Sequence, residues 1–168
     1  MARAARATQI TSVRQERPER VSLDPADRQI IEMLQVDGRR SYGSMAEQVG
    51  LSETAVRRRV QRLRETKAVD IVAVTDPLQL GFQREAMLGV RVNGDAREVA
   101  DAIAAIDEAI YVVMTAGSFD LLVEMICEDD DHLFHVLNDR IRALPGVTEV
   151  ETFVYLKLAK QTYSWGTR

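Results

Sequence analysis

Apolar positions in the first third of the chain recur every three or four residues, the period of a helix with one buried face. Helix starts are indicated by Asp24 with Pro25, by Ser41 and by Ser52, whose side chains can cap a first turn. The pattern predicts three helices that end near residues 36, 49 and 67, in a domain over residues 21–68. Their buried positions are Ile30, Ile31, Met33 and Leu34, then Met45, Ala46 and Val49, then Val56, Val60 and Leu63.

From about Glu85 the pattern changes to short apolar runs that alternate with two helical segments. The order strand-helix-strand-strand-helix-strand predicts a ferredoxin-like sandwich over residues 84–158, an antiparallel sheet with both helices on one face. Residues 69–83 are expected to form a linker with a strand at 69–74 and a loop, and residues 159–168 a tail. The four strands of the sheet are expected at residues 87–92, 110–115, 119–127 and 147–158.

Two of the predicted strands carry apolar residues on both faces. A sheet with helices on one side only should have a polar outer face. The second face therefore needs a cover, and the simplest cover is another copy of the chain in a two-fold contact, so we expect a dimer. The alternating positions are Ile110, Val112 and Met114 against Tyr111 and Val113, and Phe119, Leu121, Val123 and Met125 against Leu122 and Ile126.

The net charge of −4 is divided unevenly along the chain. Residues 1–70 carry 14 Lys and Arg against 10 Asp and Glu, a net charge of +4. Residues 71–168 carry 8 against 16, a net charge of −8. This split favours a DNA-contacting first part joined to a part that does not touch DNA. Residues 1–20 are Arg-rich without an apolar period, and we expect a disordered tail that is either merely solvated or attracted to phosphate.

Nothing in the sequence predicts a membrane or secreted protein. No apolar run is long enough to span a bilayer, and residues 1–20 lack the apolar core of a signal peptide. The single cysteine, Cys127, offers no disulfide framework and is expected to be a small buried strand residue rather than a nucleophile. These features predict a cytoplasmic protein.

The second and third helices are joined through Gly50, where a left-handed backbone makes a tight turn. Thr54, Arg58 and Gln61 point away from the apolar stripe of the third helix, whereas Arg59 lies nearer to it and suits a phosphate better than a base. Arginine can bond guanine and glutamine adenine in the major groove, which indicates a helix-turn-helix. The alternative is a solvated basic face on an ordinary helical hairpin. The predicted DNA-binding residues are Ser52, Thr54, Arg57, Arg58, Arg59, Gln61 and Arg62.

At this point the sequence resembles a known family. The matching segments are LDPADRQIIEML, SYGSMAEQVGLSETAVRRRVQRLRE, VTDPLQLG, TAGSFDLLVEM and LPGVTEVETFVYLKL. In this order they resemble the Lrp/AsnC (feast/famine) transcription regulators from about Val21 to Tyr163. The predicted fold is α+β, an N-terminal three-helix (winged) helix-turn-helix domain followed by the βαββαβ domain.

The resemblance implies a sequence-specific DNA-binding regulator that forms dimers through its sheets, and often tetramers or octamers. It also implies that an amino acid or related small metabolite binds between dimers, near the β-hairpin turn. A glycine turn can offer backbone amides to a carboxylate, and an acidic side chain can hold an ammonium group. The alternative is that Gly117 only makes the hairpin and Asp120 is a solvated strand residue. The effector-binding residues implied are Gly117, Ser118, Phe119, Asp120, Thr152 and Val154; many relatives carry an acidic residue where Ser118 stands.

The chemistry of an enzyme is not evident in the sequence, which contains neither a P-loop nor a G-x-G-x-x-G motif. His132 and His135 lie one helical turn apart, but two ligands make an incomplete metal site, so we expect no metal, no cofactor and no enzyme. Two alternatives stay open. Siroheme decarboxylases resemble the same two-domain layout, and an architectural protein could compact DNA with little sequence preference.

Overall fold

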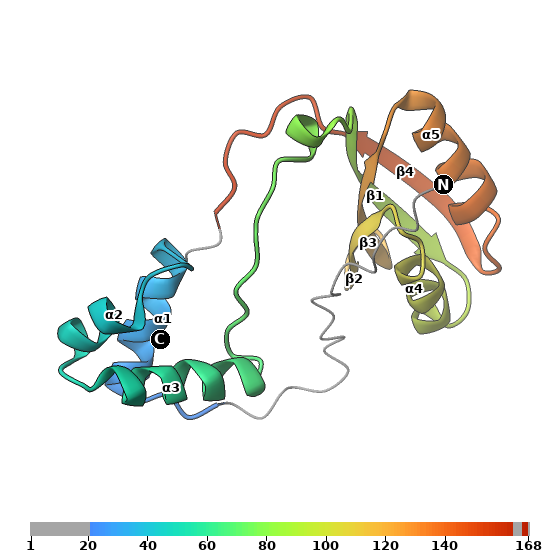
Figure 1. The fold of residues 1–168 in the computed structure, drawn as a ribbon. Helices are drawn as coiled ribbons and strands as arrows, with labels where there is room; N and C mark the ends of the chain where they lie inside the picture. The colour runs from blue at the N-terminus through green and yellow to red at the C-terminus, as the bar shows by residue number, and fades with distance from the viewer. Residues whose placement is uncertain (1–20, 163–165, 168) are drawn as a thin grey trace. The chain divides into compact units, whose positions relative to one another are not determined.

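The computed structural model describes residues 21–162, 166 and 167 (Figure 1). The predicted Arg-rich tail, residues 1–20, lies outside the described residues. The described residues divide into two compact units, one made of residues 21–73 with 161, 162, 166 and 167, the other of Val74–Lys160. Within the described residues, no helix is both long and apolar enough to cross a membrane.

The first unit contains three helices, α1 (Pro25–Val36), α2 (Tyr42–Val49) and α3 (Glu53–Glu65). Each begins at a side-chain cap, because Asp24, Ser41 and Ser52 accept hydrogen bonds from backbone N–H groups in the first turn. Their apolar stripes meet in one core, as the sequence pattern predicts. This core comprises Ile30, Ile31, Met33, Leu34, Met45, Ala46, Val56, Val60 and Leu63.

Gly166 and Thr167, in the segment expected to be a tail, contact the first unit. The backbone N–H of Gly166 donates to Oε1 of Gln35 at 3.2 Å. The Thr167 hydroxyl donates to Oε1 of Glu32 at 2.7 Å. Both acceptors lie on α1, so Gly166 and Thr167 lie beside the first helix.

The second unit is a four-stranded antiparallel sheet with strand order β2-β3-β1-β4, the order of a ferredoxin-like sandwich. A short 3-10 turn, η1 (Pro77–Leu80), precedes it, and α5 continues directly into a π-helical segment, η2 (Val136–Ile141). The other elements are β1 (Arg84–Val92), α4 (Ala96–Ala104), β2 (Ala109–Met114), β3 (Leu121–Cys127), α5 (Asp130–His135) and β4 (Val147–Val154).

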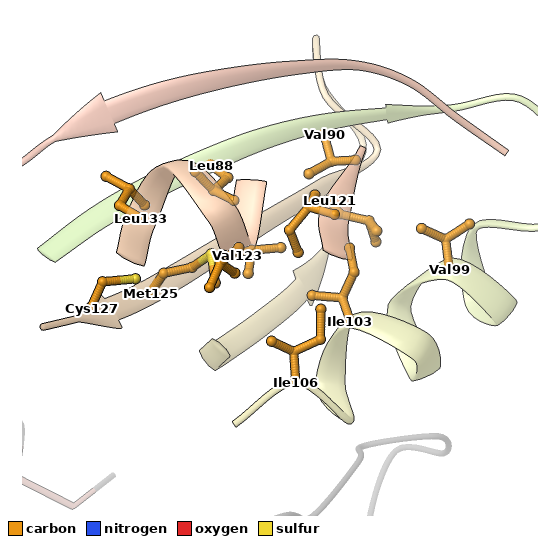
Figure 2. Close-up of a cluster of buried hydrophobic side chains, with 12 residues drawn as sticks. Leu88, Val90, Val99, Ile103, Ile106, Leu121, Val123, Met125, Cys127 and Leu133 are labelled. Atoms are coloured by element: carbon orange, nitrogen blue, oxygen red, sulfur yellow. The ribbon is translucent and has the colours of Figure 1, made fainter. Parts of the chain in front are cut away.

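The core of this unit lies between one face of the sheet and the two helical segments (Figure 2). In β3 every second residue is fully buried, from Leu121 to Cys127, which is the alternation of a strand with one covered face. Val99 and Ile103 of α4 and Leu133 of α5 close the core from the other side. Both helices therefore cover the same face of the sheet, as expected.

The opposite face of the sheet, here called the open face, carries apolar and aromatic residues. It includes Met87 on β1, Leu122 and Ile126 on β3, Tyr111 and Val113 on β2 and Phe153 on β4. Tyr111 is 52% exposed and Phe153 is 44% exposed. The sequence correctly predicted apolar residues on both faces of the hairpin strands.

The open face also holds Glu85, whose pKa is raised above the ordinary 4.5 by burial, with smaller contributions from the carboxylates of Glu124 and Asp76. A carboxyl group whose pKa is higher in the folded than in the unfolded state lowers the free energy of unfolding at neutral pH. This loss of stability disappears as the pH falls to the pKa that the group has in the unfolded state. We expect Glu85→Gln to be more stable than the wild type at pH 7 and equally stable near about pH 4. Urea unfolding across that range measures this, and a gap that widens on acidification would contradict it.

Several sequence-based expectations about the strands differ from the structure. The strand expected at 69–74 is not formed, and the helix-turn-helix unit has no wing strand in its described part, because Ile71 and Val72 have no neighbouring strand to pair with. The last strand ends at Val154 rather than at 158: its ladder with β1 ends at the Ala86–Val154 pair, followed by one more hydrogen bond, from the Tyr155 N–H to the Glu85 carbonyl at 2.9 Å. The third strand begins at Leu121 rather than at Phe119, which lies in the hairpin turn.

Candidate DNA interface and effector site

The turn between α2 and α3 has the geometry of a helix-turn-helix. Gly50 has φ +68°, and its N–H donates to the carbonyl of Ala46, which ends α2. Leu51 N–H also donates to that carbonyl at 3.1 Å, and the Ser52 hydroxyl then accepts the N–H of Ala55 at 3.2 Å. The backbone thus turns at Gly50 and Leu51, and α3 begins with a first-turn N–H group that is hydrogen-bonded to its cap residue, Ser52.

The outward face of α3 carries polar side chains, as predicted. Thr54, Arg58 and Gln61 are all exposed. The Gln61 amide donates to Oε1 of Glu65 at 2.9 Å on the same helix. Arg57 is also exposed, and it pairs with Glu53 at 3.0 Å while its guanidinium lies 5.0 Å from the ring centre of Tyr42. Such exposed pairs on one helix are weak and can yield to a ligand.

Arg59 and Arg62 lie differently from the other predicted DNA-binding residues. Nη1 of Arg59 donates to Asp24 at 2.6 Å and to Asp27 at 2.7 Å, and Nη2 of Arg62 donates to the second oxygen of Asp27. The Arg59 side chain is 28% exposed and that of Arg62 is 48% exposed. The structure therefore joins these two arginines to α1 instead of grouping them with Arg58.

Asp24 and Asp27 form a reciprocal cap on α1. Each carboxylate accepts the backbone N–H of the other residue, at 2.8 Å from Asp27 and 3.2 Å from Asp24. The N–H of Asp27 and the guanidinium of Arg59 hold the pKa of Asp24 below its ordinary 3.8. The sequence identified Asp24 and Asp27 only as helix-start residues. Their ion pairs with residues more than 30 positions away were not predicted.

A groove of about 470 Å³ opens beside the outward face of α3 and adds cations that the prediction omitted. Two of its lining residues, Arg64 in the last turn of α3 and Lys67 just after that helix, are exposed. A signal for Arg64 was available, because it follows Gln61 by three residues on the same helix. The groove is lined by Tyr42, Arg57, Val60, Gln61, Arg64, Glu65, Lys67 and Asp70.

The candidate effector turn lies between β2 and β3, and its acidic residue has a structural partner. Oδ2 of Asp120 accepts the N–H of Val92 at 2.7 Å, and the Asp120 N–H donates to the carbonyl of Val90 at 2.9 Å. Thr115 closes the turn, since its N–H donates to the Asp120 carbonyl at 2.9 Å. Gly117 and Ser118 are exposed at its tip. Asp120 is therefore half-buried and bonded to β1, unlike the solvated residue of the alternative interpretation.

Phe119 lies on the open face, whereas the strand pattern predicted it on the face of Leu121. Its ring lies against Gly89, where an added Cβ would be 2.6 Å from a ring carbon. It meets the Phe153 ring edge-on, with centroids 6.4 Å apart, and the guanidinium of Arg91 lies 5.5 Å from its centre. The prediction was wrong because the turn, not the strand alternation, directs this side chain.

Thr152 and Val154 do not join Phe119. They pair with Leu88 and Ala86 of β1, both buried on the helix-covered face, and residues directly opposite in a ladder share a face. Phe153, between them, is the β4 residue that meets Phe119. Within one chain, Thr152 and Val154 thus lie on the opposite side of the sheet from Phe119.

The other residues that the sequence singled out have structural partners. Burial raises the pKa of the Cys127 thiol to about 11, so it stays protonated at neutral pH. His132 Nε2 lies 3.0 Å from Glu108, whereas His135 Nδ1 lies 3.2 Å from Asp139. The two rings thus contact different carboxylates. In the part of the chain that the structure describes, no group of three or more His, Cys, Asp and Glu could hold a metal ion.

The fold and the arginine-bearing helix define a two-domain helix-turn-helix protein. Residues 23–64 match the model of the AsnC-type helix-turn-helix domain, and residues 85–165 match that of the Lrp/AsnC ligand-binding domain. The chain belongs to the Lrp/AsnC family of transcriptional regulators.

The chain matches related regulators over nearly their whole length. The chain is 34% identical over 145 residues to the HTH-type transcriptional regulator FL11 of Pyrococcus horikoshii, covering 85% of this chain and 95% of the relative. It is 35% identical over 146 residues to the proline dehydrogenase transcriptional activator of Rhizobium radiobacter, covering 83% and 93%.

Solved structures share the fold. A transcriptional regulator from Neisseria meningitidis, in complex with L-methionine, is 26% identical and superposes with a TM-score of 0.77 over 85% of this chain and 96% of that one. AsnC of E. coli, at 24% identity, gives a TM-score of 0.76 over 83% and 96%.

Proposed function

We propose that this chain is an oligomeric transcription regulator that binds specific DNA through α3 and responds to a small metabolite of the amino-acid class. The observation that carries the proposal is the exposed face of α3. Arg58 and Gln61 lie on this face, away from the buried residues of the helix. These side chains suit the base edges of the major groove. Because the chain must reach DNA and carries a single buried thiol, we place it in the cytoplasm.

The outward residues divide into two kinds of DNA contact. Thr54, Arg58 and Gln61 are proposed to contact base edges. Ser52, at the start of the helix, and Arg57 are proposed to contact phosphates, because helix N-termini and exposed arginines suit anions. The test is selection of duplexes from a random pool by the purified chain. Enrichment of one sequence supports the proposal, whereas equal retention of all sequences favours a nonspecific architectural protein.

The open face is proposed to pair two copies of the chain. Half-buried Met87, Leu122 and Ile126, with partly exposed Tyr111 and Phe153, would lose their remaining contact with water in a two-fold contact. A dimer would also present two α3 helices to two half-sites of DNA.

We expect the purified protein to sediment as a dimer or a larger even assembly at micromolar concentration. Leu122→Lys, which puts a charge in the middle of the open face, should shift the protein toward the monomer while the helical signal is retained. A sedimenting monomer in the wild type would contradict this pairing.

The effector is proposed to bind near the turn that contains Gly117 and Ser118, where exposed backbone amides can receive a carboxylate. The related Neisseria structure contains L-methionine, which supports the amino-acid class. Since Thr152 and Val154 lie on the other side of the sheet, a site that includes them needs a second copy of the chain. Thermal unfolding in the presence of each L-amino acid tests the proposal, because a ligand that binds only the folded state raises the midpoint.

A further inference from the structure

The junction of α1 and α3 contains a carboxylate that the DNA-binding surface does not explain. Asp27 is 1% exposed and is the single buried charged residue in the described part of the chain. Its two carboxylate oxygens accept hydrogen bonds from two different residues of α3. Oδ1 accepts from Arg59 at 2.7 Å, and Oδ2 accepts from Arg62. Arg59 also reaches Asp24 at 2.6 Å, so two carboxylates and two guanidinium groups form one network.

This network constrains α3 in a way that the apolar core does not. Contacts among Ile30, Val56 and Val60 exclude water, but they are non-directional and tolerate small rotations of a helix about its axis. A carboxylate that accepts a hydrogen bond from a different arginine on each oxygen can keep both bonds at only one rotation of α3 about its axis. Turning α3 by one residue, about 100°, would carry both guanidinium groups away and leave a buried charge without partners.

The same contacts argue against a phosphate role for these arginines. To bind a phosphate, Arg59 would have to leave two carboxylates, or place the phosphate beside them, where like charges repel. Arg58 and Arg64 carry no such cost, because both are exposed and form no ion pair within the described residues.

We propose that Asp27, Arg59 and Arg62 are positioning residues that set the rotation of α3 about its own axis. This setting directs Thr54, Arg58 and Gln61 outward, and neither Arg59 nor Arg62 contacts DNA. The importance of the setting for base recognition rests on the proposed function. The rotation itself can be measured without DNA.

The DNA-free test uses paired nitroxide labels at Gln29→Cys on α1 and Thr54→Cys on α3, both exposed positions. Cys127 can stay, since it is buried and its pKa of about 11 keeps it unreactive toward the label. Arg59→Met should shift or broaden the distance distribution between the labels. Arg64→Met, the same change on the same helix, should leave it unaltered. An unaltered distribution in Arg59→Met would overturn the proposal.

Arg59→Met is the informative variant because Arg62 still pairs with the buried carboxylate, so the domain keeps its fold. Asp27→Asn is the second variant, and combining it with Arg59→Met should add little to either alone, since both break the same network. Fully additive shifts in the label distances would contradict a shared network.

The DNA test compares the full chain on two duplexes of equal length, one enriched from a random pool by the wild type and one of random sequence. Arg59→Met should weaken binding to the enriched duplex about tenfold, with random-duplex affinity and salt dependence unchanged. A phosphate contact would instead lower both affinities together and reduce the slope of log K against log salt by about 0.9. That outcome would overturn the proposal. If the wild type enriches no sequence, the proposed function fails, and the label distances still decide the positioning role.

Discussion

Arg58→Ala should lose about 10- to 100-fold in affinity for the enriched DNA duplex, with the unfolding temperature of the protein unchanged. Arg58 is exposed on α3 between Thr54 and Gln61, so the substitution leaves no cavity and no unpaired partner in the described structure. A bidentate arginine-guanine contact contributes about 1–3 kcal/mol of discrimination, or about 5- to 150-fold, and the expected loss lies within that range. Fluorescence anisotropy at fixed salt measures the change.

A matched control separates base recognition from loss of charge. Arg97→Ala removes the same charge from the exposed face of α4 in the second domain, and it should leave DNA affinity within about twofold of the wild type. Arg58→Ala should also relax the sequence preference in a repeated selection, whereas the control should not. An unchanged affinity and preference in Arg58→Ala would show that α3 does not read bases through this residue.

Gly89→Ala should destabilise the second domain by about 1–3 kcal/mol, because the new methyl group meets an aromatic ring. The added Cβ would lie 2.6–2.7 Å from three ring carbons of Phe119, well inside van der Waals contact. The ring must therefore leave Gly89 and give up its contacts with Phe153 and Arg91. Urea unfolding measures the loss of stability, and the loss of the Phe119–Phe153 contact can be followed by aromatic proton shifts.

Gly117→Ala is the matched control for this prediction. No atom lies within 4 Å of its added Cβ, and its backbone does not have the positive φ that disfavours alanine. The free energy of unfolding should change by less than about 1 kcal/mol, and in the stabilising direction if the unfolded chain loses freedom. Equal destabilisation by both substitutions would show that the ring contact at Gly89 is not the cause.

The helices of the first domain could be predicted closely because their ends depend on local chemistry. Asp24 with Pro25, Ser41 and Ser52 cap their own first turns, and Gly50 ends α2 with a left-handed residue. The order of strands and helices in the second domain followed from hydrophobic period together with turn and cap residues such as Asn93-Gly94, Asp95 and Pro145-Gly146. So did the burial of alternate residues along β3.

The differences arise where distant residues decide the outcome. The β-branched run at 69–74 has strand propensity, but a strand also needs a partner, and sequence propensity does not supply one. Phe119 takes its direction from the turn and from the space above Gly89. The roles of Arg59 and Arg62 depend on Asp27, 32 and 35 residues away, so helical spacing along α3 could locate them near the core but could not show what they bond.

The bond from Val92 to the Asp120 carboxylate has a consequence for any molecule that occupies the hairpin turn. An ammonium group that replaced Val92 as the partner of Oδ2 would exchange one hydrogen bond, with an N···O distance of 2.7 Å, for another, so part of its attraction would be offset. The amide of Val92 belongs to the last residue of β1, one of the two inner strands of the sheet. A ligand that displaced this hydrogen bond would therefore loosen the end of β1 as well as fill the turn.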